Sequence, residues 1–172
     1  FKNGSIMKPT IIALVGSSGS GKTTLSLYLQ EHDGIPAVCS YTTRPMREGE
    51  INGRDHWFVG HGHPIPEKPL AYTFFGGNHY WTDPAQINSR FTTYVIDEKG
   101  LIELKNPWGD EYEILSVYIE RPDRGDIDEG RKLRDTERVN IDSDLYDIVL
   151  HNVSDLESFL KTAASTIKAF IY

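Results

Sequence analysis

The glycine-rich segment at residues 16–23, with the sequence GSSGSGKT, constrains this chain more than any other feature. It follows an apolar run at residues 11–15 and opens a segment whose apolar residues have helical spacing. Strand, glycine-rich turn and helix form the context in which the pattern G-x-x-x-x-G-K-[ST] binds phosphate groups. A glycine-serine linker that happens to end in Lys-Thr would not stand between a buried strand and an amphipathic helix. The segment therefore predicts a nucleoside triphosphate site.

Each residue type in this segment has a physical role at a phosphate group. Glycines let the backbone curl so that successive N–H groups face an anion, and the amino end of the following helix adds partial positive charge. We expect Lys22 to reach the β- and γ-phosphates, and the Thr23 hydroxyl to bind Mg²⁺. The ATP-binding residues predicted in this segment are Gly16, Ser18, Gly19, Ser20, Gly21, Lys22, Thr23 and Thr24.

Composition places the chain among single-domain α/β proteins. Its 172 residues are 38% hydrophobic and 25% charged, which suits one domain with a sizeable core. The net charge of −7 argues against a nucleic-acid partner, and no apolar run is long enough to cross a membrane. The single cysteine, Cys39, excludes an intrachain disulfide and fits a reducing, cytoplasmic setting. Residues 1–6 are expected to form a tail.

A pair of arginines marks a second candidate site. Arg44 and Arg47 follow a short predicted strand at residues 37–39, and open α/β sheets bind ligands at the carboxyl ends of their strands. Two guanidinium groups three residues apart can hold one phosphate group through paired hydrogen bonds. The alternative is a solvated turn in which the arginines pair with Glu48 and Glu50. These residues alone favour the alternative.

Taken together, these segments resemble the guanylate kinase family. The resemblance rests on residues 16–23, on SYTTRPMREGEINGRD at residues 40–55 and on LAYTFFGGNHYWT at residues 70–82. Residues 95–97 and 150–156 are similar to an acidic strand end and a late asparagine loop of that family. The resemblance implies a P-loop NTPase-type fold, with three α/β/α layers around a parallel sheet in one domain, residues 1–172. It also implies an inserted acceptor-binding region at about 40–82 and a short lid at about 121–138.

The same resemblance implies an activity and a set of site residues. A cytoplasmic monomer or homodimer would transfer the γ-phosphoryl group of ATP, bound with Mg²⁺, to a nucleoside monophosphate. Catalytic roles would fall to Lys22, Arg44, Arg124, Arg131 and Arg134, and Asn152 would join the ATP site. The acceptor would be bound by Ser40, Arg44, Arg47, His56, Tyr80, Thr82 and Asp97.

Departures from the family's pattern concern the acceptor base. Ala71 stands where the family has a glutamate that reads guanine, His56 replaces a phosphate-binding tyrosine, and Trp81 replaces a glycine. A site that lacks a buried base-reading partner discriminates poorly, so we do not expect strict guanine specificity. Three alternatives stay open: another nucleotide as acceptor, a sugar phosphate such as ribose 1,5-bisphosphate, or a non-catalytic binding module. The intact glycine-rich segment favours an enzyme.

The remaining predictions concern secondary structure and its charged residues. We expect strands at residues 92–96, 114–119 and 148–150, a short helix at about 83–90, and a final helix capped by Ser154 and Glu157. Asp97 is interpreted either as a helix N-cap or as a contact to the acceptor base or to Mg²⁺-bound water. The charged run at residues 120–138 predicts either a solvated helix or a lid whose arginines contact the transferred phosphoryl group.

Overall fold

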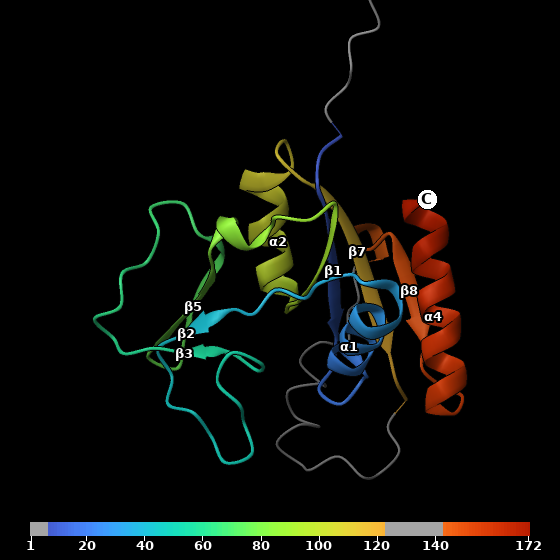
Figure 1. The fold of residues 1–172 in the computed structure, drawn as a ribbon, viewed down its shortest axis with the longest axis horizontal. Coiled ribbons are helices and arrows are strands. Elements are labelled where there is room, and N and C mark those ends of the chain that lie inside the picture. Colours follow the sequence, from blue (N-terminus) through green and yellow to red (C-terminus); the bar gives the residue numbers. More distant parts are fainter. Residues whose placement is uncertain (1–6, 123–142) are drawn as a thin grey trace, which may run out of the picture.

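A four-stranded parallel sheet forms the centre of the molecule, for which a computed structural model describes residues 7–122 and 143–172 (Figure 1). Its strands are β6 (Phe91–Val95), β1 (Thr10–Gly16), β7 (Glu113–Glu120) and β8 (Ile148–His151), in that order across the sheet. Residues 11–16 of β1 are all buried. A central parallel strand is covered on both faces, which explains the unbroken apolar run that precedes the glycine-rich loop.

Helices cover both faces of this sheet, and the alternation of side chains along β1 shows why. Ile12 and Leu14 pack in the core beneath α1 (Lys22–Asp33) and α4 (Leu156–Ile171). The intervening Ile11 and Val15 face the side covered by α2 (Glu98–Trp108) (Figure 1). Successive side chains of a strand point to opposite faces, so one apolar strand supplies two cores. The predicted three-layer α/β fold is confirmed.

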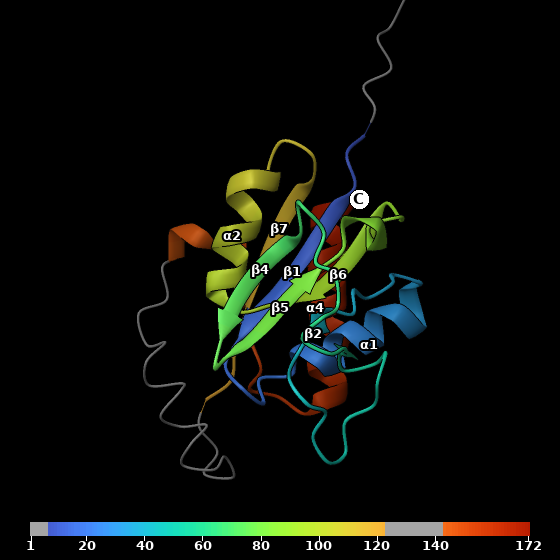
Figure 2. The ribbon, with the colours of Figure 1, turned by 90° about the vertical axis from the view of Figure 1, so that its left-hand side faces the viewer.

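A second sheet is formed by segments of the chain between α1 and β6. It is formed by β3 (Trp57–Phe58), β2 (Tyr41–Thr42), β5 (Asn78–Thr82) and β4 (Leu70–Phe75), in that order. Strands β4 and β5 form a hairpin whose turn residues, Gly76 and Gly77, both have left-handed φ angles of 58° and 78°. Figure 2 shows this hairpin in front of β1. Leu70 of β4 and Leu104 of α2 belong to the same buried cluster.

Two of the predicted secondary-structure elements are wrong in extent, and one amide side chain explains both. Residues 37–39 form only an isolated bridge, Ala37 to Thr93, and the predicted helix at 83–90 is a single 3₁₀ turn, Pro84–Gln86. The Gln86 amide accepts from the backbone N–H of Cys39 and donates to its carbonyl oxygen. The Gln86 side chain thus makes the two hydrogen bonds to Cys39 that a neighbouring strand would make. The same bonds hold the 3₁₀ turn against residues 37–39.

The final helix begins one residue later than predicted. The Asp155 carboxylate, rather than the Ser154 hydroxyl, accepts from the backbone N–H of Ser158, so Asp155 is the N-cap of α4. Leu156 and Phe170 are exposed at the ends of the helix, whereas its middle packs on the sheet. None of the described helices has the length and apolar character needed to span a membrane.

Candidate nucleotide-binding site

The carboxyl ends of all four central strands meet at one edge of the sheet, where open α/β sheets bind their ligands. Strand β1 runs into the glycine-rich loop, and β6 is followed by Asp97. Arg121 follows β7, and Asn152 follows β8. Residues that are far apart in the sequence therefore surround a single region of the molecule.

The loop that follows β1 is shaped for an anion. Gly19 and Gly21 have left-handed φ angles of 75° and 108°, a conformation that L side chains rarely adopt. Gly21 is the N-cap of α1 and supplies no side-chain cap, which leaves the first N–H groups of the helix without that kind of partner. Ser18 is partly buried, whereas Thr23 and Thr24 are exposed at the start of the helix. Such an uncapped amino end is suited to phosphate binding.

Two cationic side chains lie on carbonyl groups of this loop. Lys22 Nζ donates to the carbonyl oxygens of Gly16 at 2.6 Å and Ser17 at 2.8 Å. Arg121 Nη1 donates to the carbonyl oxygen of Gly19 at 2.8 Å. The sequence analysis did not single out Arg121. The position of Arg121 directly after a buried strand could have indicated a site residue. We did not separate it from the charged run at residues 120–138.

Asn152 supports the loop from behind. Its side chain is buried, and Nδ2 donates to the carbonyl oxygen of Ser20 at 2.8 Å. A Cβ added to Gly21 would lie 3.2 Å from the same Nδ2 atom, so the amide and the loop pack closely. The Ser20 hydroxyl is buried and has no hydrogen-bond partner among the described residues. Asn152 thus holds the loop in position, and its predicted role at an ATP site stays a prediction.

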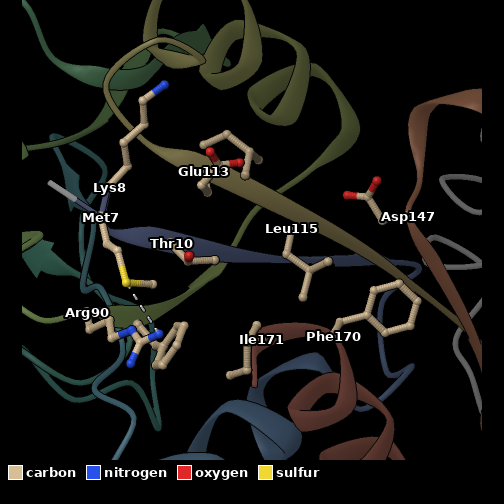
Figure 3. A pocket seen from close by; sticks show the side chains of 11 residues that line it. Met7, Lys8, Thr10, Arg90, Glu113, Leu115, Asp147, Phe170 and Ile171 are labelled. Carbon is tan, nitrogen blue, oxygen red and sulfur yellow. Dashed lines mark hydrogen bonds between the residues drawn. The ribbon is translucent and has the colours of Figure 1, made fainter. Parts of the chain in front are cut away.

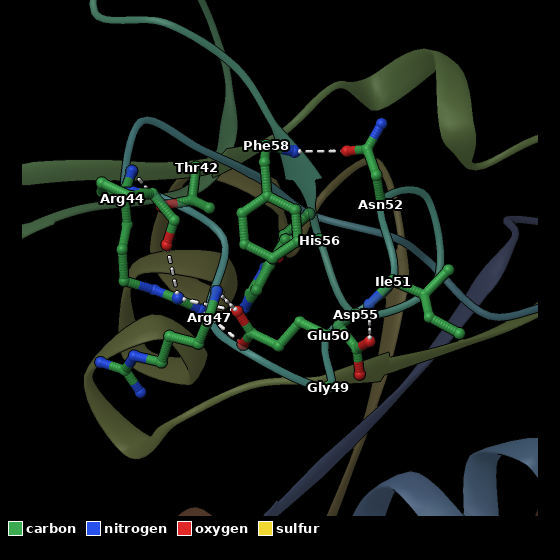
Figure 4. A network of polar contacts seen from close by, with 12 residues as sticks. Thr42, Arg44, Arg47, Gly49, Glu50, Ile51, Asn52, Asp55, His56 and Phe58 are labelled. Carbon is green, nitrogen blue, oxygen red and sulfur yellow. Dashed lines mark hydrogen bonds and ion pairs between the residues drawn. The ribbon is translucent and has the colours of Figure 1, made fainter.

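Figure 4 shows how the arginine-rich segment is held together by one carboxylate. Arg44 donates through Nη2 to Glu50 Oε1 at 2.8 Å and through Nη1 to Oε2 at 2.9 Å. The same Glu50 accepts from the backbone N–H of Arg47 at 2.7 Å. Hydrogen bonding from Arg44 is the largest cause that lowers the pKa of Glu50 to about 2, and Glu50 in turn raises the pKa of Arg44.

The pairing predicted as the alternative interpretation is therefore present for one arginine. Arg44 pairs with Glu50, whereas the side chain of Arg47 is exposed and points away from that carboxylate (Figure 4). The pair does not occupy every donor of Arg44, because a guanidinium carries five N–H groups. The Arg44 guanidinium also lies 5.3 Å from the ring centre of Phe58, which fixes its plane.

Beside this network lies a pocket of about 220 Å³ between the two sheets. Its lining includes Ser40, His56, Ala71, Tyr80, Tyr94 and Asp97. Ser40 Oγ and His56 Nδ1 are 2.8 Å apart and form a hydrogen bond. Burial, followed by the charge of Arg44, lowers the pKa of His56 and so favours the neutral imidazole. The hydroxyl of Tyr80 lies close enough to Arg44 to help raise the pKa of that guanidinium.

Thr82 and Asp97, two further predicted acceptor contacts, also have partners within the protein. Thr82 is fully buried, and its Oγ1 donates to the Tyr94 hydroxyl at 2.7 Å. Asp97 Oδ1 accepts from the backbone N–H of Gly100 at 2.7 Å and so caps α2. Asp97 also lines the pocket, and both interpretations offered for it are compatible with this placement. Tyr94 was not predicted, because an inward-facing tyrosine on a central strand is indistinguishable in sequence from a core residue.

A cleft of about 440 Å³ joins the two halves of the candidate site. Its lining includes Thr23 from the amino end of α1, and Glu50 and Asp55 from the arginine-rich segment. Ser40 and His56 line both this cleft and the pocket beside it. The structure thus places Thr23, the last residue of the glycine-rich segment, and the predicted acceptor residues Ser40 and His56 on the walls of one cleft. The predicted lid residues Arg124, Arg131 and Arg134 lie outside the described residues.

Figure 3 shows a further cavity, of about 550 Å³, at the opposite edge of the main sheet. It is lined by residues that begin strands, such as Thr10 and Glu113, and by Arg90 and Phe170. It therefore lies at the amino ends of β1 and β7, away from the glycine-rich loop.

Comparison with known proteins agrees with this geometry. The family model described as guanylate kinase matches residues 7–169. The chain is 34% identical to a guanylate kinase of Nitrobacter winogradskyi over 134 residues, which cover 69% of this chain and 58% of that protein. It is 29% identical to a guanylate kinase of Sus scrofa over 142 residues, covering 75% and 69%. The predicted family resemblance is confirmed.

A solved structure shares the fold. The crystal structure of guanylate kinase from Anaplasma phagocytophilum matches with a TM-score of 0.68 and 21% sequence identity, covering 95% of this chain and 86% of that one. The chain spans between 58% and 67% of the length of the first bacterial relatives that it matches in sequence.

Proposed function

The chain belongs to the guanylate kinase family, and we propose that it transfers the γ-phosphoryl group of ATP to a nucleoside monophosphate. The observation that carries this proposal is the cleft shared by the two predicted sites. Thr23, at the start of α1, and Glu50, in the arginine-rich segment, line the same hollow. Phosphoryl transfer needs little covalent chemistry from a protein, but it needs two phosphates in line and their charge stabilised.

On the donor side, the loop and its cations bind the triphosphate. Lys22 Nζ donates to the carbonyl oxygens of Gly16 and Ser17, so its positive charge lies at the loop that we propose to hold the phosphates. Thr23 is exposed on the cleft wall, so its hydroxyl is available to Mg²⁺ as a hard oxygen ligand. When bound, Mg²⁺ supplies positive charge that bridges and neutralises the phosphate oxygens.

On the acceptor side, Arg44, Arg47 and Tyr80 bind the monophosphate. Glu50 holds the Arg44 guanidinium in a fixed plane by two hydrogen bonds, so the donors that remain are already oriented for a phosphate. The exposed guanidinium of Arg47 adds a second positive charge. Arg124, Arg131 and Arg134 stay candidates for stabilising the transferred group. The pocket beside the cleft receives the acceptor nucleoside.

The family result favours a nucleotide kinase over the sugar-phosphate kinase and the non-catalytic module. GMP is the acceptor that the names of the relatives suggest, and it is the first acceptor to test. We further propose that residues 1–172 form one domain with an acceptor-binding region at about 40–82 and a lid at about 121–138. A cytoplasmic monomer or homodimer remains our prediction for the assembled protein.

The test is an ADP-release assay with ATP and Mg²⁺ against a panel of nucleoside and deoxynucleoside monophosphates and ribose 1,5-bisphosphate. We expect turnover with at least one nucleoside monophosphate and none with ribose 1,5-bisphosphate. The Lys22→Ala variant serves as the control for contaminating kinases. Turnover only with ribose 1,5-bisphosphate, or no turnover with any acceptor, would contradict the proposal.

A further inference from the structure

The floor of the acceptor pocket contains a hydrogen-bond donor rather than a second carboxylate. Tyr94 is only 4% exposed, on β6, and its hydroxyl is fixed by the buried Thr82. The geometry makes Thr82 the donor and the Tyr94 oxygen the acceptor in this 2.7 Å hydrogen bond. The phenolic proton of Tyr94 is therefore not used on Thr82. No hydrogen bond from it to any residue of the described ranges 7–122 and 143–172 is present.

Tyr94 remains a donor throughout the neutral pH range. Burial is the largest cause that raises the pKa of Tyr94, and the negative charge of Asp97 raises it further, whereas the bond from Thr82 has the opposite effect. A buried phenol with an unused proton is costly unless a partner accepts it. Tyr94 is one of the residues that line the pocket, so a molecule bound there can supply the accepting atom.

Beside Tyr94, the wall of the pocket is formed by the methyl side chain of Ala71. Ala71 packs in the same cluster as Tyr94 and lines the pocket, and its φ of 47° places it at an irregularity between β4 and β5. Glu67, the nearest preceding carboxylate in the sequence, is exposed and is not part of the pocket lining. Among the described residues that line the pocket, Asp97 supplies the only carboxylate.

We propose that Tyr94 selects the acceptor base by donating its phenolic proton to an acceptor atom of the base, while the 2-amino group of a purine goes unread. This inference rests on the proposed function and refines it to a substrate class: 6-oxopurine monophosphates with or without a 2-amino group. Tyr94 donates to the 6-oxo oxygen, and the free oxygen of Asp97 accepts from the adjacent N1–H. No acceptor remains at Ala71 for the 2-amino group.

The first experiment compares GMP with IMP, which differ only by the 2-amino group. We expect values of kcat/KM within about threefold of each other, because nothing in the pocket accepts from that group. A carboxylate that read the group would favour GMP by about 10- to 150-fold. The Ala71→Glu variant should shift the ratio toward GMP, and Ala71→Gln is its matched uncharged control. A wild-type preference for GMP above tenfold would overturn the inference.

The second experiment tests the donor itself. Tyr94→Phe removes only one hydroxyl and should lower kcat/KM for both acceptors by about 5- to 150-fold, with the KM for ATP unchanged. Tyr146→Phe is the matched control, since Tyr146 is a buried tyrosine outside the pocket, with its hydroxyl bound to Glu98 at 2.7 Å. It should change thermal stability without changing acceptor use. Equal effects of the two variants on acceptor kcat/KM would overturn the role of Tyr94.

Calorimetric binding of GMP and IMP separates this inference from the proposed function. If wild type binds both nucleotides with similar affinity, and Tyr94→Phe weakens both, the inference holds even when no phosphoryl transfer is measured. If transfer to GMP occurs but Tyr94→Phe binds and uses it normally, the proposed function holds and the inference fails.

Discussion

Arg44 and Glu50, six residues apart in one loop, are joined by two hydrogen bonds of 2.8 and 2.9 Å between their side chains. Their side chains are only 11% and 21% exposed, so the pair is shielded from water far more than an ordinary surface ion pair. Removing one partner of such a pair leaves the other without its counter-charge. The conformation of the loop that carries Arg44 therefore depends on Glu50.

This pair predicts a dependence of stability on pH. The pKa of Glu50 is lowered from an ordinary value of 4.5 to about 2, so its stabilisation is fully present above pH 4.5 and is lost as the pH falls toward 2. At neutral pH, Glu50→Gln should lower the free energy of unfolding by about 1–3 kcal/mol. The difference between wild type and variant should shrink across that acidic range in denaturant titrations. A difference that stays constant down to pH 2 would contradict the assignment.

Loss of Arg44 should affect one substrate and not the other. Arg44→Met should raise the KM for the acceptor and lower kcat, at a cost of about 1.5–3 kcal/mol for a lost charge-assisted contact, while the KM for ATP stays near normal. Arg90→Met is the matched control, because Arg90 is exposed at the opposite edge of the main sheet. Equal changes for both substrates would instead indicate a folding defect.

Lys22→Ala should abolish turnover with little change in the melting temperature. Lys22 is not a core residue, and its Nζ contacts the loop carbonyls of Gly16 and Ser17. Loss of a charge that stabilises the transferred phosphoryl should lower kcat by at least about 100-fold. Lys161→Ala, on the exposed face of α4, should leave kcat unchanged. Steady-state rates and thermal melts measure both effects, and near-normal activity of Lys22→Ala would rule out this loop as the donor site.

Two glycines of the same loop should differ in their tolerance of a methyl group. A Cβ on Gly16 would clash with the carbonyl oxygen of Ile119 on β7 and lie 2.8 Å from the Ser20 hydroxyl, whereas a Cβ on Gly19 would meet nothing within 4 Å. Gly19→Ala should therefore cost only the backbone strain of its left-handed φ, about 1–2 kcal/mol. Gly16→Ala should cost clearly more in denaturant unfolding. Equal costs would show that the loop can move away from β7.

Asn152 should act through the loop rather than on ATP directly. Asn152→Ala removes the 2.8 Å bond to the carbonyl oxygen of Ser20 and should lower stability by about 1–3 kcal/mol. Because the loop is then less ordered, the KM for ATP should rise while the KM for the acceptor changes little. The ratio of the two KM values is the measurement, and an unchanged KM for ATP in a destabilised variant would confine Asn152 to a purely structural role.

The sequence predicted those parts of the fold and the site that depend on local spacing. The glycine-rich loop was predictable because its glycines, lysine and threonine lie within eight positions, residues 16–23, next to an apolar strand. The apolar runs of β1, β7 and β8 indicated buried parallel strands for a similar reason. The final helix was also predicted, although Asp155 rather than Ser154 caps it.

Features that depend on distant partners were not predictable in the same way. Thr82 and Tyr94 meet across two sheets, and nothing near either residue in the sequence indicates that contact. Arg121 reaches Gly19, 102 positions earlier in the chain. Gln86 binds the backbone of Cys39, and the helix predicted at residues 83–90 is only a short turn. Helix propensity carries no information about such a distant partner. In each case a contact between residues that are distant in the sequence determined the structure, and the local sequence pattern did not contain that information.

Ser40 and His56 are hydrogen-bonded to each other and line both the pocket and the cleft beside it. The pair therefore forms a wall that the two hollows share. Under the proposed function, a misplaced acceptor base would displace the same two side chains, which also border the cleft proposed for phosphoryl transfer. Errors in base choice are then felt as misalignment during transfer, so discrimination among acceptors should be expressed as slow turnover more than as weak binding.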